Sequence, residues 1–323
     1  MFITFLLAIG IIVGGLIGGR LLRFLIETQK LPAHIPLDKL IKNMIPFVIL
    51  GLNPLILIGA FWIVEIQEME FLFLPVIGIF TLLLGGVFAL IAARIYQHNN
   101  KQAGAMFVSG SFSNLGSFGM LFCFLFLGEM GLAIAAMFRL FEELFYYTVC
   151  FPVAKRYGEA EEKQAKKSKI KQLIKDPFIM VTLIAVCLGV GLNFSTIERP
   201  EFFGTLNEFL VPLATFLLVV PLGFSMRVKS VRTYLKEGFT LAFIKSALVP
   251  VVVVGVAYLL GLGSYQDGLL LKVILILAAM PPAVMALVPA QLYKLEIELA
   301  NANWIVSTSM LVVVLPILYF LIQ

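Results

Sequence analysis

Long apolar runs separated by short polar loops form the main pattern along this chain of 323 residues. A helix that crosses a lipid bilayer needs about 20 predominantly apolar residues. The pattern predicts ten such helices, and therefore an all-α polytopic membrane protein. Their expected bounds are Phe2–Arg20, Lys42–Val64, Phe71–Arg94, Ala103–Leu127, Leu132–Val153, Phe178–Phe194, Phe203–Met226, Gly238–Leu262, Leu269–Tyr293 and Asn303–Ile322.

The fourth and ninth runs are interrupted, whereas the third and tenth are expected to be continuous. The ninth run contains Pro281, Pro282 and Pro289, and a proline inside a helix removes a backbone hydrogen bond at a cost of about 3 kcal/mol. The fourth run is interrupted by Gly110, Ser111, Ser113, Asn114, Gly116, Ser117 and Gly119. Because hydrocarbon cannot satisfy freed backbone groups, both breaks are expected inside protein or beside water. Two interrupted helices in matching places of two halves indicate the binding site of a secondary transporter.

The loops between the expected helices differ strongly in charge. Twenty Lys and Arg residues lie in one set of loops, and only Arg199 and Lys272 lie in the opposite set. Cytoplasmic loops carry the excess of basic residues. The sequence therefore predicts an inner (plasma) membrane protein with both termini outside the cytoplasm and a cytoplasmic Lys-rich linker at 155–176.

That linker divides the chain into two sets of five helices, residues 1–154 and 177–323. An odd number of crossings forces the second set to enter the membrane upside down. The prolines agree with such an inverted repeat, since Pro46 and Pro54 in the second helix match Pro212 and Pro221 in the seventh. The sequence predicts two inverted five-helix repeats.

Composition supports the membrane assignment and excludes other classes. The chain is 61% hydrophobic and 13% charged, with a mean hydropathy of +1.02. A soluble domain is only about 45–50% apolar and is about 25% charged. Its net charge of +5 comes from the loops, so no nucleic-acid partner is expected. Three single cysteines give neither a disulfide framework nor a metal site. No catalytic or Walker motif is present, so neither an enzyme nor an ATP-driven pump is expected.

The breaks suggest how an anion would be held. The N-terminus of a half-helix presents unsatisfied N–H groups and partial positive charge. Neutral hydroxyl and amide side chains there could orient a carboxylate, and carbonyls at the C-termini could hold a cation. The candidate substrate-binding residues are Ser111, Ser113, Asn114, Ser117, Pro281, Pro282, Met285 and Asn53. The alternative is that the small residues only allow close helix packing and that Asn53 marks a plain hinge.

Charged residues inside apolar runs are the second signal. Arg139 has Glu142 and Glu143 at the i,i+3 and i,i+4 positions, where either can pair with it. Charges at this depth usually face the protein interior and mark function. One glutamate is expected to face inward as a proton carrier; a structural ion pair is the alternative. Lys245 is expected to reach the interface or to pair with these carboxylates, and Asn301 and Asn303 to cap the tenth helix.

An ordered set of residues resembles the auxin efflux carrier family, of the bile-acid, arsenite and PIN-like transporter superfamily. The set comprises Lys175-Asp176-Pro177, Gly189, Pro200, Leu222-Gly223, Ala279-Met280-Pro281, Ala290, Tyr293, Leu299-Ala300, Thr308 and Pro316. The resemblance covers essentially the whole chain. The sequence departs from the family's pattern in the fourth helix, where Ser111 and Phe118 stand at the positions of the family's usual Asn and Pro.

The resemblance implies the fold of the bile-acid transporters and of the antiporter NhaA, with broken helices 4 and 9 crossed. It also implies a scaffold of helices 1, 2, 6 and 7, a homodimer through that scaffold, and a mobile transport domain of helices 3–5 and 8–10. Family substrates are small mono- or dicarboxylates. We therefore expect an elevator-type secondary transporter without a cofactor, coupled to H⁺ or to Na⁺. The alternatives are an uncoupled facilitator, a channel or a membrane sensor of the same fold.

Overall fold

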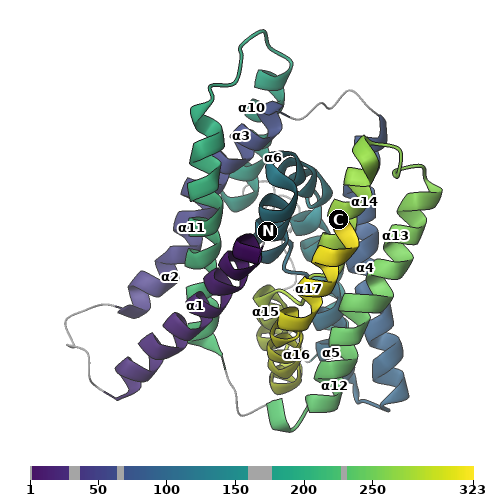
Figure 1. Cartoon of the computed structure of the whole chain (residues 1–323). Helices are drawn as coiled ribbons and strands as arrows, with labels where there is room; N and C mark the ends of the chain where they lie inside the picture. Colours follow the sequence, from purple (N-terminus) through teal and green to yellow (C-terminus); the bar gives the residue numbers. More distant parts are fainter. Residues whose placement is uncertain (1, 29–36, 64–68, 159–176, 227–230) are drawn as a thin grey trace. The chain divides into compact units, whose positions relative to one another are not determined.

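The structure is a computed structural model that describes residues 2–28, 37–63, 69–158, 177–226 and 231–323. Every regular element in these ranges is helical (Figure 1). The chain divides into two compact units. The first holds the described residues of 1–67, 120–133 and 174–226, and the second holds those of 68–119, 134–173 and 227–323.

The first unit is a group of long apolar helices. Its elements are α1 (Phe2–Glu27), α2 (Leu37–Phe47), the π-helical turn η1 (Val48–Leu52), α3 (Asn53–Ile63), α10 (Pro177–Asn193), α11 (Phe202–Ser225) and the first part of α6 (Met120–Phe138). α1 packs along α11, and α3 packs along α10 (Figure 1). Glycines make the first contact close: a Cβ on Gly19 would lie 2.0 Å from the carbonyl oxygen of Val220. The α1–α11 interface therefore tolerates no side chain at Gly19.

Polar contacts join the same helices near their ends. The Trp62 carbonyl accepts a hydrogen bond of 2.9 Å from the Asn193 side chain. Glu129 accepts two hydrogen bonds from the guanidinium of Arg199, of 2.6 and 2.8 Å, and one of 2.8 Å from Asn207 on α11. A bidentate pair of this kind fixes orientation as well as distance. It holds Glu129, the residue that follows the kink at Gly128 (φ +71°) in α6.

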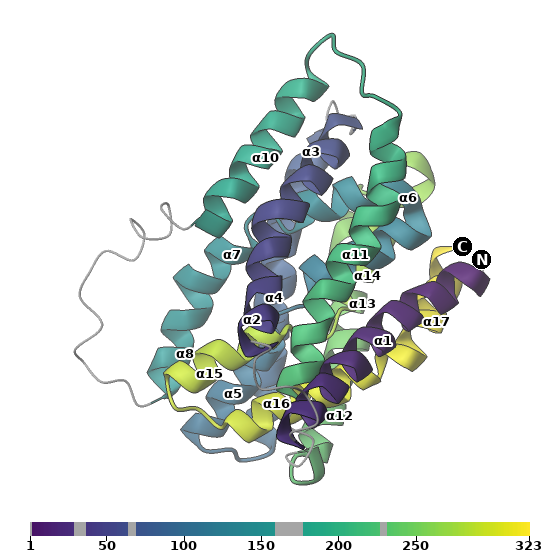
Figure 2. The same ribbon diagram turned by 90° about the vertical axis from the view of Figure 1, so that its left-hand side faces the viewer.

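The second unit contains more broken helices. Its elements are η2 (Met69–Phe73), α4 (Leu74–Ile95), α5 (Asn100–Ser111), η3 (Leu115–Gly119), α7 (Glu142–Phe145), η4 (Tyr146–Cys150), α8 (Phe151–Tyr157), α12 (Leu235–Phe243), η7 (Ile244–Leu248), α13 (Val249–Leu259), η8 (Gln266–Gly268), α14 (Leu269–Ala278), η9 (Val284–Ala286), α15 (Leu287–Leu292), α16 (Ile297–Ser309) and α17 (Leu311–Ile322). α4 packs on α5, α12 on α16, and α13 on α14 (Figure 2).

Three π-helical turns lie just before a proline. η1, η4 and η7 are followed by Pro54, Pro152 and Pro250, each within two residues of the end of its turn. A proline ring clashes with the carbonyl of the fourth preceding residue and supplies no N–H to it. Widening the preceding turn relieves that clash, and such turns are frequent at functional sites. Tyr146 and Lys245 lie in two of them.

The described residues contain six helical stretches that are long and apolar enough to cross a membrane, or seven if the bent pair α16 and α17 counts as one. Fewer than the ten expected helices meet this test because several are broken or short. The fourth and fifth fall in one stretch, Asn100–Tyr157, the ninth is split into α14 and α15, and the sixth is a shorter apolar helix, Met180–Asn193. An all-helical polytopic membrane protein is therefore confirmed, whereas the ten-helix inverted repeat stays a prediction.

The expectation of a continuous tenth helix is wrong. α16 and α17 meet at an angle of 47°, and the residues from Leu299 to Thr308 on α16 are all buried. Asn301 and Asn303 lie in the interior of α16, 2% and 0% exposed, so they are not helix caps. The Asn303 amide group donates to Met106 Sδ of α5 at 3.3 Å. The Lys-rich linker at 155–176 lies outside the described residues from position 159 onward.

Candidate functional site

The two predicted helix breaks lie side by side in the second unit. α5 ends at Ser111 and the chain becomes helical again at Leu115, while α14 ends at Ala278 and η9 begins at Val284. Between them the backbone N–H of Asn114 donates to the carbonyl of Pro281 at 2.8 Å, and that of Ala283 donates to Phe112 at 3.3 Å. The two extended segments thus form a short antiparallel pair. This pairing satisfies backbone groups that the breaks would otherwise leave buried without partners.

The ninth break follows directly from its prolines. Pro281 and Pro282 have no N–H to continue the helix, and a residue before proline is pushed out of the α region. Both prolines are buried. The fourth break has no proline; its extended residue Phe112 instead stacks on Tyr146, with ring centroids 4.1 Å apart.

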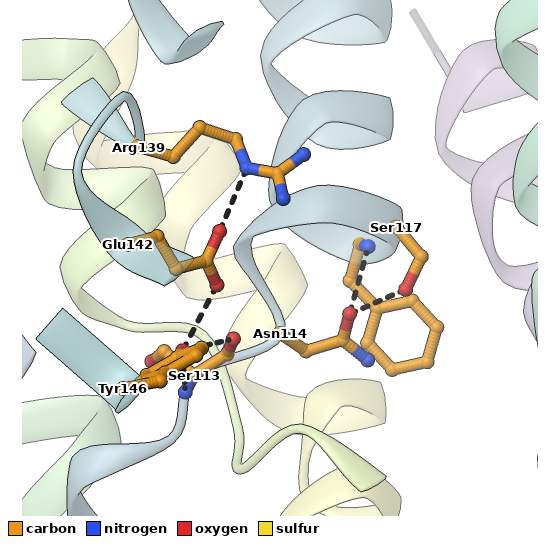
Figure 3. A network of polar contacts seen from close by, with 7 residues as sticks. Ser113, Asn114, Ser117, Arg139, Glu142 and Tyr146 are labelled. Atoms are coloured by element: carbon orange, nitrogen blue, oxygen red, sulfur yellow. Dashed lines mark hydrogen bonds and ion pairs between the residues drawn. The ribbon is translucent and has the colours of Figure 1, made fainter. Parts of the chain in front are cut away.

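Asn114 caps the second half of the fourth helix. Its Oδ1 accepts hydrogen bonds from the Ser117 hydroxyl and from the Phe118 backbone N–H, the latter at 3.4 Å (Figure 3). This is the role of an N-cap residue, which satisfies N–H groups in the first turn. Among the described residues the Asn114 amide nitrogen donates to none. The Asn114 side chain is 6% exposed, and its role in binding a substrate stays a prediction.

A positive charge lies at the start of this half-helix. A Cβ on Gly116 would lie 2.8 and 3.0 Å from the two terminal nitrogens of the Arg139 guanidinium. The first turn of a helix already favours anions through its unsatisfied N–H groups and its dipole. Arg139 therefore adds a formal charge to a terminus that attracts negative ligands even without one.

A carboxylate and a tyrosine connect Arg139 to the break. The Arg139 Nε donates to Glu142 Oε2 at 2.8 Å, and the Tyr146 hydroxyl donates to Glu142 Oε1 at 2.9 Å. The same hydroxyl accepts the Ser113 backbone N–H at 3.0 Å (Figure 3). Glu142 is 6% exposed, while Glu143 is half-buried. The predicted i,i+3 pair is confirmed, and Glu142 is the glutamate that faces inward.

Tyr146 is the member of this network that sequence reasoning missed. It is 2% exposed and lies four residues after Glu142, on the same helix face. The i,i+4 spacing from Glu142 was the sequence signal that could have identified Tyr146 as its partner. The contact with Ser113, 33 residues away, could not be foreseen from the local pattern.

Lys245 neither reaches the membrane interface nor pairs with a carboxylate of the fifth helix, the two positions predicted for it. Its side chain is 1% exposed, so it does not reach the interface. Its ammonium donates to the Gly110 carbonyl at 3.2 Å and to the Ser113 hydroxyl at 2.6 Å. Among the described residues no carboxylate forms an ion pair with it. The prediction of direct pairing with the span-five carboxylates is wrong; the link to Glu142 runs through Ser113 and Tyr146.

The other predicted site residues are less closely connected to the network. Ser111 is fully buried at the end of α5 and points at Gly86 of α4, where an added Cβ would be 2.0 Å from its hydroxyl. Met285 is half-buried in η9. Asn53 is half-buried at the start of α3 and belongs to the first unit. The roles of these three residues stay predictions.

Comparison with known proteins agrees with the membrane fold. The family described as Membrane transport protein matches residues 41–319. An uncharacterized transporter of Methanocaldococcus jannaschii is 25% identical over 252 residues, which cover 78% of this chain and 79% of that protein. A Rhizobium meliloti protein named "Putative malonate transporter" is 26% identical over 243 residues, or 73% of each chain. The match spans most of the chain, so this protein belongs to the Membrane transport protein family, the auxin efflux carriers, and is a membrane transporter and not an enzyme.

Proposed function

We propose that this protein is a secondary transporter of a small organic anion, with the substrate held at the paired breaks of the fourth and ninth helices. The observation that carries the proposal is the position of the Arg139 guanidinium against Gly116, in the first turn after the fourth-helix break. Membership of a transporter family gives the class of activity. The Arg139 charge at the break supports a negatively charged substrate.

The site suits a carboxylate for three reasons. The half-helix terminus and Arg139 attract negative charge. The Asn114 amide group supplies a neutral donor that orients a carboxylate without holding it irreversibly. Glu142, which bonds both Arg139 and Tyr146, limits the net positive charge and so permits release. The Rhizobium relative is named for malonate, and we propose mono- or dicarboxylates as the substrate class here.

We further propose that the chain works as an elevator, with ten helices in two inverted repeats and a dimer formed through the scaffold helices. The division into two compact units supports this mechanism. The first unit collects the expected helices 1, 2, 6 and 7, and the second collects most of helices 3–5 and 8–10. Residues 120–133, which belong to the expected fourth and fifth helices and the loop between them, group with the first unit.

Proton coupling through the fifth helix is the proposed source of energy. Glu142 lies in a hydrogen-bonded network that reaches the break through Tyr146 and Ser113. By gaining or losing a proton, the Glu142 carboxylate can change the charge of the site, with Arg139 as its ion-pair partner. Glu143 is the second candidate for the proton carrier. The alternative within this class is an uncoupled facilitator. A channel needs polar residues at many depths, whereas the charged network here gathers around the breaks.

Counterflow in proteoliposomes tests the proposal. Vesicles loaded with unlabelled malonate should accumulate labelled malonate transiently, and the initial rate should saturate with substrate concentration. Empty liposomes and liposomes loaded with a neutral diol of similar size are the controls. Conductance without saturation would support a channel, and the absence of any exchange across a panel of mono- and dicarboxylates would contradict the proposal.

A further inference from the structure

Lys245 is a buried cation to which the proposed function assigns no role. It lies in the π-helical turn η7, one turn before Pro250, with its side chain 1% exposed. Among the described residues, its ammonium donates to two neutral oxygens, the Gly110 carbonyl and the Ser113 hydroxyl. A buried charge held only by neutral oxygens is costly in a membrane protein and usually functional.

The position of the ammonium is the one that a coupling ion would take. Gly110 lies in the last turn of α5, where carbonyls have no partner within the helix and the helix dipole is negative. In transporters with broken helices, such C-terminal ends and unwound carbonyls coordinate Na⁺ or H⁺. The Ser113 hydroxyl, in the break itself, completes the same kind of oxygen environment at 2.6 Å.

Two glycines shape the space around the ammonium. A Cβ on Gly85 of α4 would lie 2.3 Å from the Gly110 carbonyl oxygen and 3.5 Å from the Lys245 ammonium nitrogen. A Cβ on Gly110 would lie 2.3 Å from the Gly85 carbonyl oxygen. α4 and α5 therefore meet backbone to backbone here, and the lysine side chain reaches the carbonyl at the edge of that contact.

We propose that the ammonium of Lys245 is a built-in substitute for an alkali-metal coupling ion. It neutralises the C-terminal end of α5 and holds Ser113 in place at the break, so that anion transport requires neither Na⁺ nor K⁺. This inference rests on the proposed function and deepens it, because it assigns the cation of the same site. A lysine that serves only packing would be replaceable by an uncharged side chain of equal length.

The first test uses the wild-type protein. Uptake of labelled malonate, or of whichever carboxylate shows counterflow, is measured with Na⁺ and K⁺ replaced on both sides by N-methyl-D-glucamine. The uptake rate should stay within about twofold of the rate measured with Na⁺ and K⁺ present, because a change of salt by itself alters charge screening. A strict requirement for Na⁺ or K⁺ overturns the inference and leaves the proposed function intact.

The second test replaces the cation and does not depend on transport. Lys245→Ala should lose uptake by at least about tenfold, because the buried oxygens lose their partner. Methylammonium or Na⁺ should then raise the melting temperature of the purified variant by about 2–4 °C and restore part of the uptake. Lys245→Met fills the space without charge and should be inactive without rescue, while Lys236→Ala, exposed on α12, should behave as wild type.

The outcomes separate the two proposals. Cation binding to Lys245→Ala in the thermal assay supports the inference even if the substrate is not a carboxylate. A folded Lys245→Ala that no small cation stabilises, or a fully active Lys245→Met, overturns it. If Lys245→Ala does not fold, the wild-type uptake measured without Na⁺ and K⁺ still tests the inference, because a strict requirement for either ion overturns it.

Discussion

At the scale of single residues, Asn114 has one observed role and one proposed role that a substitution would remove together. Its Oδ1 caps the half-helix, and we propose that its amide nitrogen donates to the substrate. Asn114→Ala should lower the free energy of unfolding by about 0.5–2 kcal/mol through the lost cap. Uptake should fall by at least about tenfold, since a ligand donor is lost as well. Radiolabelled uptake normalised to membrane expression measures the effect.

Ser109→Ala is the matched control for Asn114. Its hydroxyl is fully buried on α5 and, within the described part of the chain, donates to the carbonyl of Ala105, one turn back. Such bonds contribute little to a helix, so this variant should keep wild-type uptake. Equal uptake in Asn114→Ala and Ser109→Ala would remove Asn114 from the site.

Glu142 is the residue whose protonation we expect to affect transport. Glutamine keeps the shape of the side chain but cannot titrate, so Glu142→Gln should flatten the pH dependence of uptake. Glu143→Gln, at the half-buried neighbour, should keep the wild-type profile. Initial rates between about pH 5 and pH 8, where maximal protein stability tends to lie, provide the comparison. Identical profiles for wild type and Glu142→Gln would exclude Glu142 as the proton carrier.

At the scale of elements, the half-helix that begins at Leu115 depends on a glycine in its first turn. Gly116→Ala would place a methyl group 2.8 Å from an Arg139 nitrogen, a distance that requires the guanidinium to move away. The apparent affinity for the anion should fall by about tenfold, while maximal uptake changes less, because charge near the terminus affects binding first. Concentration-dependent uptake separates the two effects.

Gly255→Ala provides the comparison for that glycine. Gly255 lies inside α13, and an added Cβ there meets nothing within 4 Å. Alanine also has a higher helix propensity than glycine, so the variant should be as stable and as active as wild type. If both variants bind the anion equally well, the closeness of Arg139 to Gly116 has no part in binding.

At the scale of the whole molecule, the charge of the loops predicts both termini outside the cytoplasm. Alkaline phosphatase is active only after export, so a fusion after Gln323 should be active and an insertion in the linker at 155–176 inactive. A green fluorescent protein fused at the same two positions should give the opposite pattern. The reverse result at either position would contradict the predicted orientation.

Much of the element pattern followed from the sequence because its signals are local. Apolar runs, prolines and clustered glycines act on the backbone within a few residues. The breaks at Ser111–Leu115 and at Ala278–Val284 therefore lie where the sequence predicted them. The family and the transporter class followed from residues spread along the chain. The bend between α16 and α17 was missed because the tenth run contains no proline near Met310.

The sequence by itself determined a helical membrane protein with two interrupted helices, because hydropathy and helix-breaking residues need no partner to act. Its resemblance to a known family supplied the transporter class. Only the tertiary structure decided which groups meet at the breaks. Asn114 pairs with Pro281, Lys245 reaches Gly110, and Tyr146 joins Glu142 to Ser113. Except for Tyr146 with Glu142, these contacts join segments from 33 to 167 residues apart. Which distant groups meet depends on how whole helices pack, and no local pattern of residues specifies that.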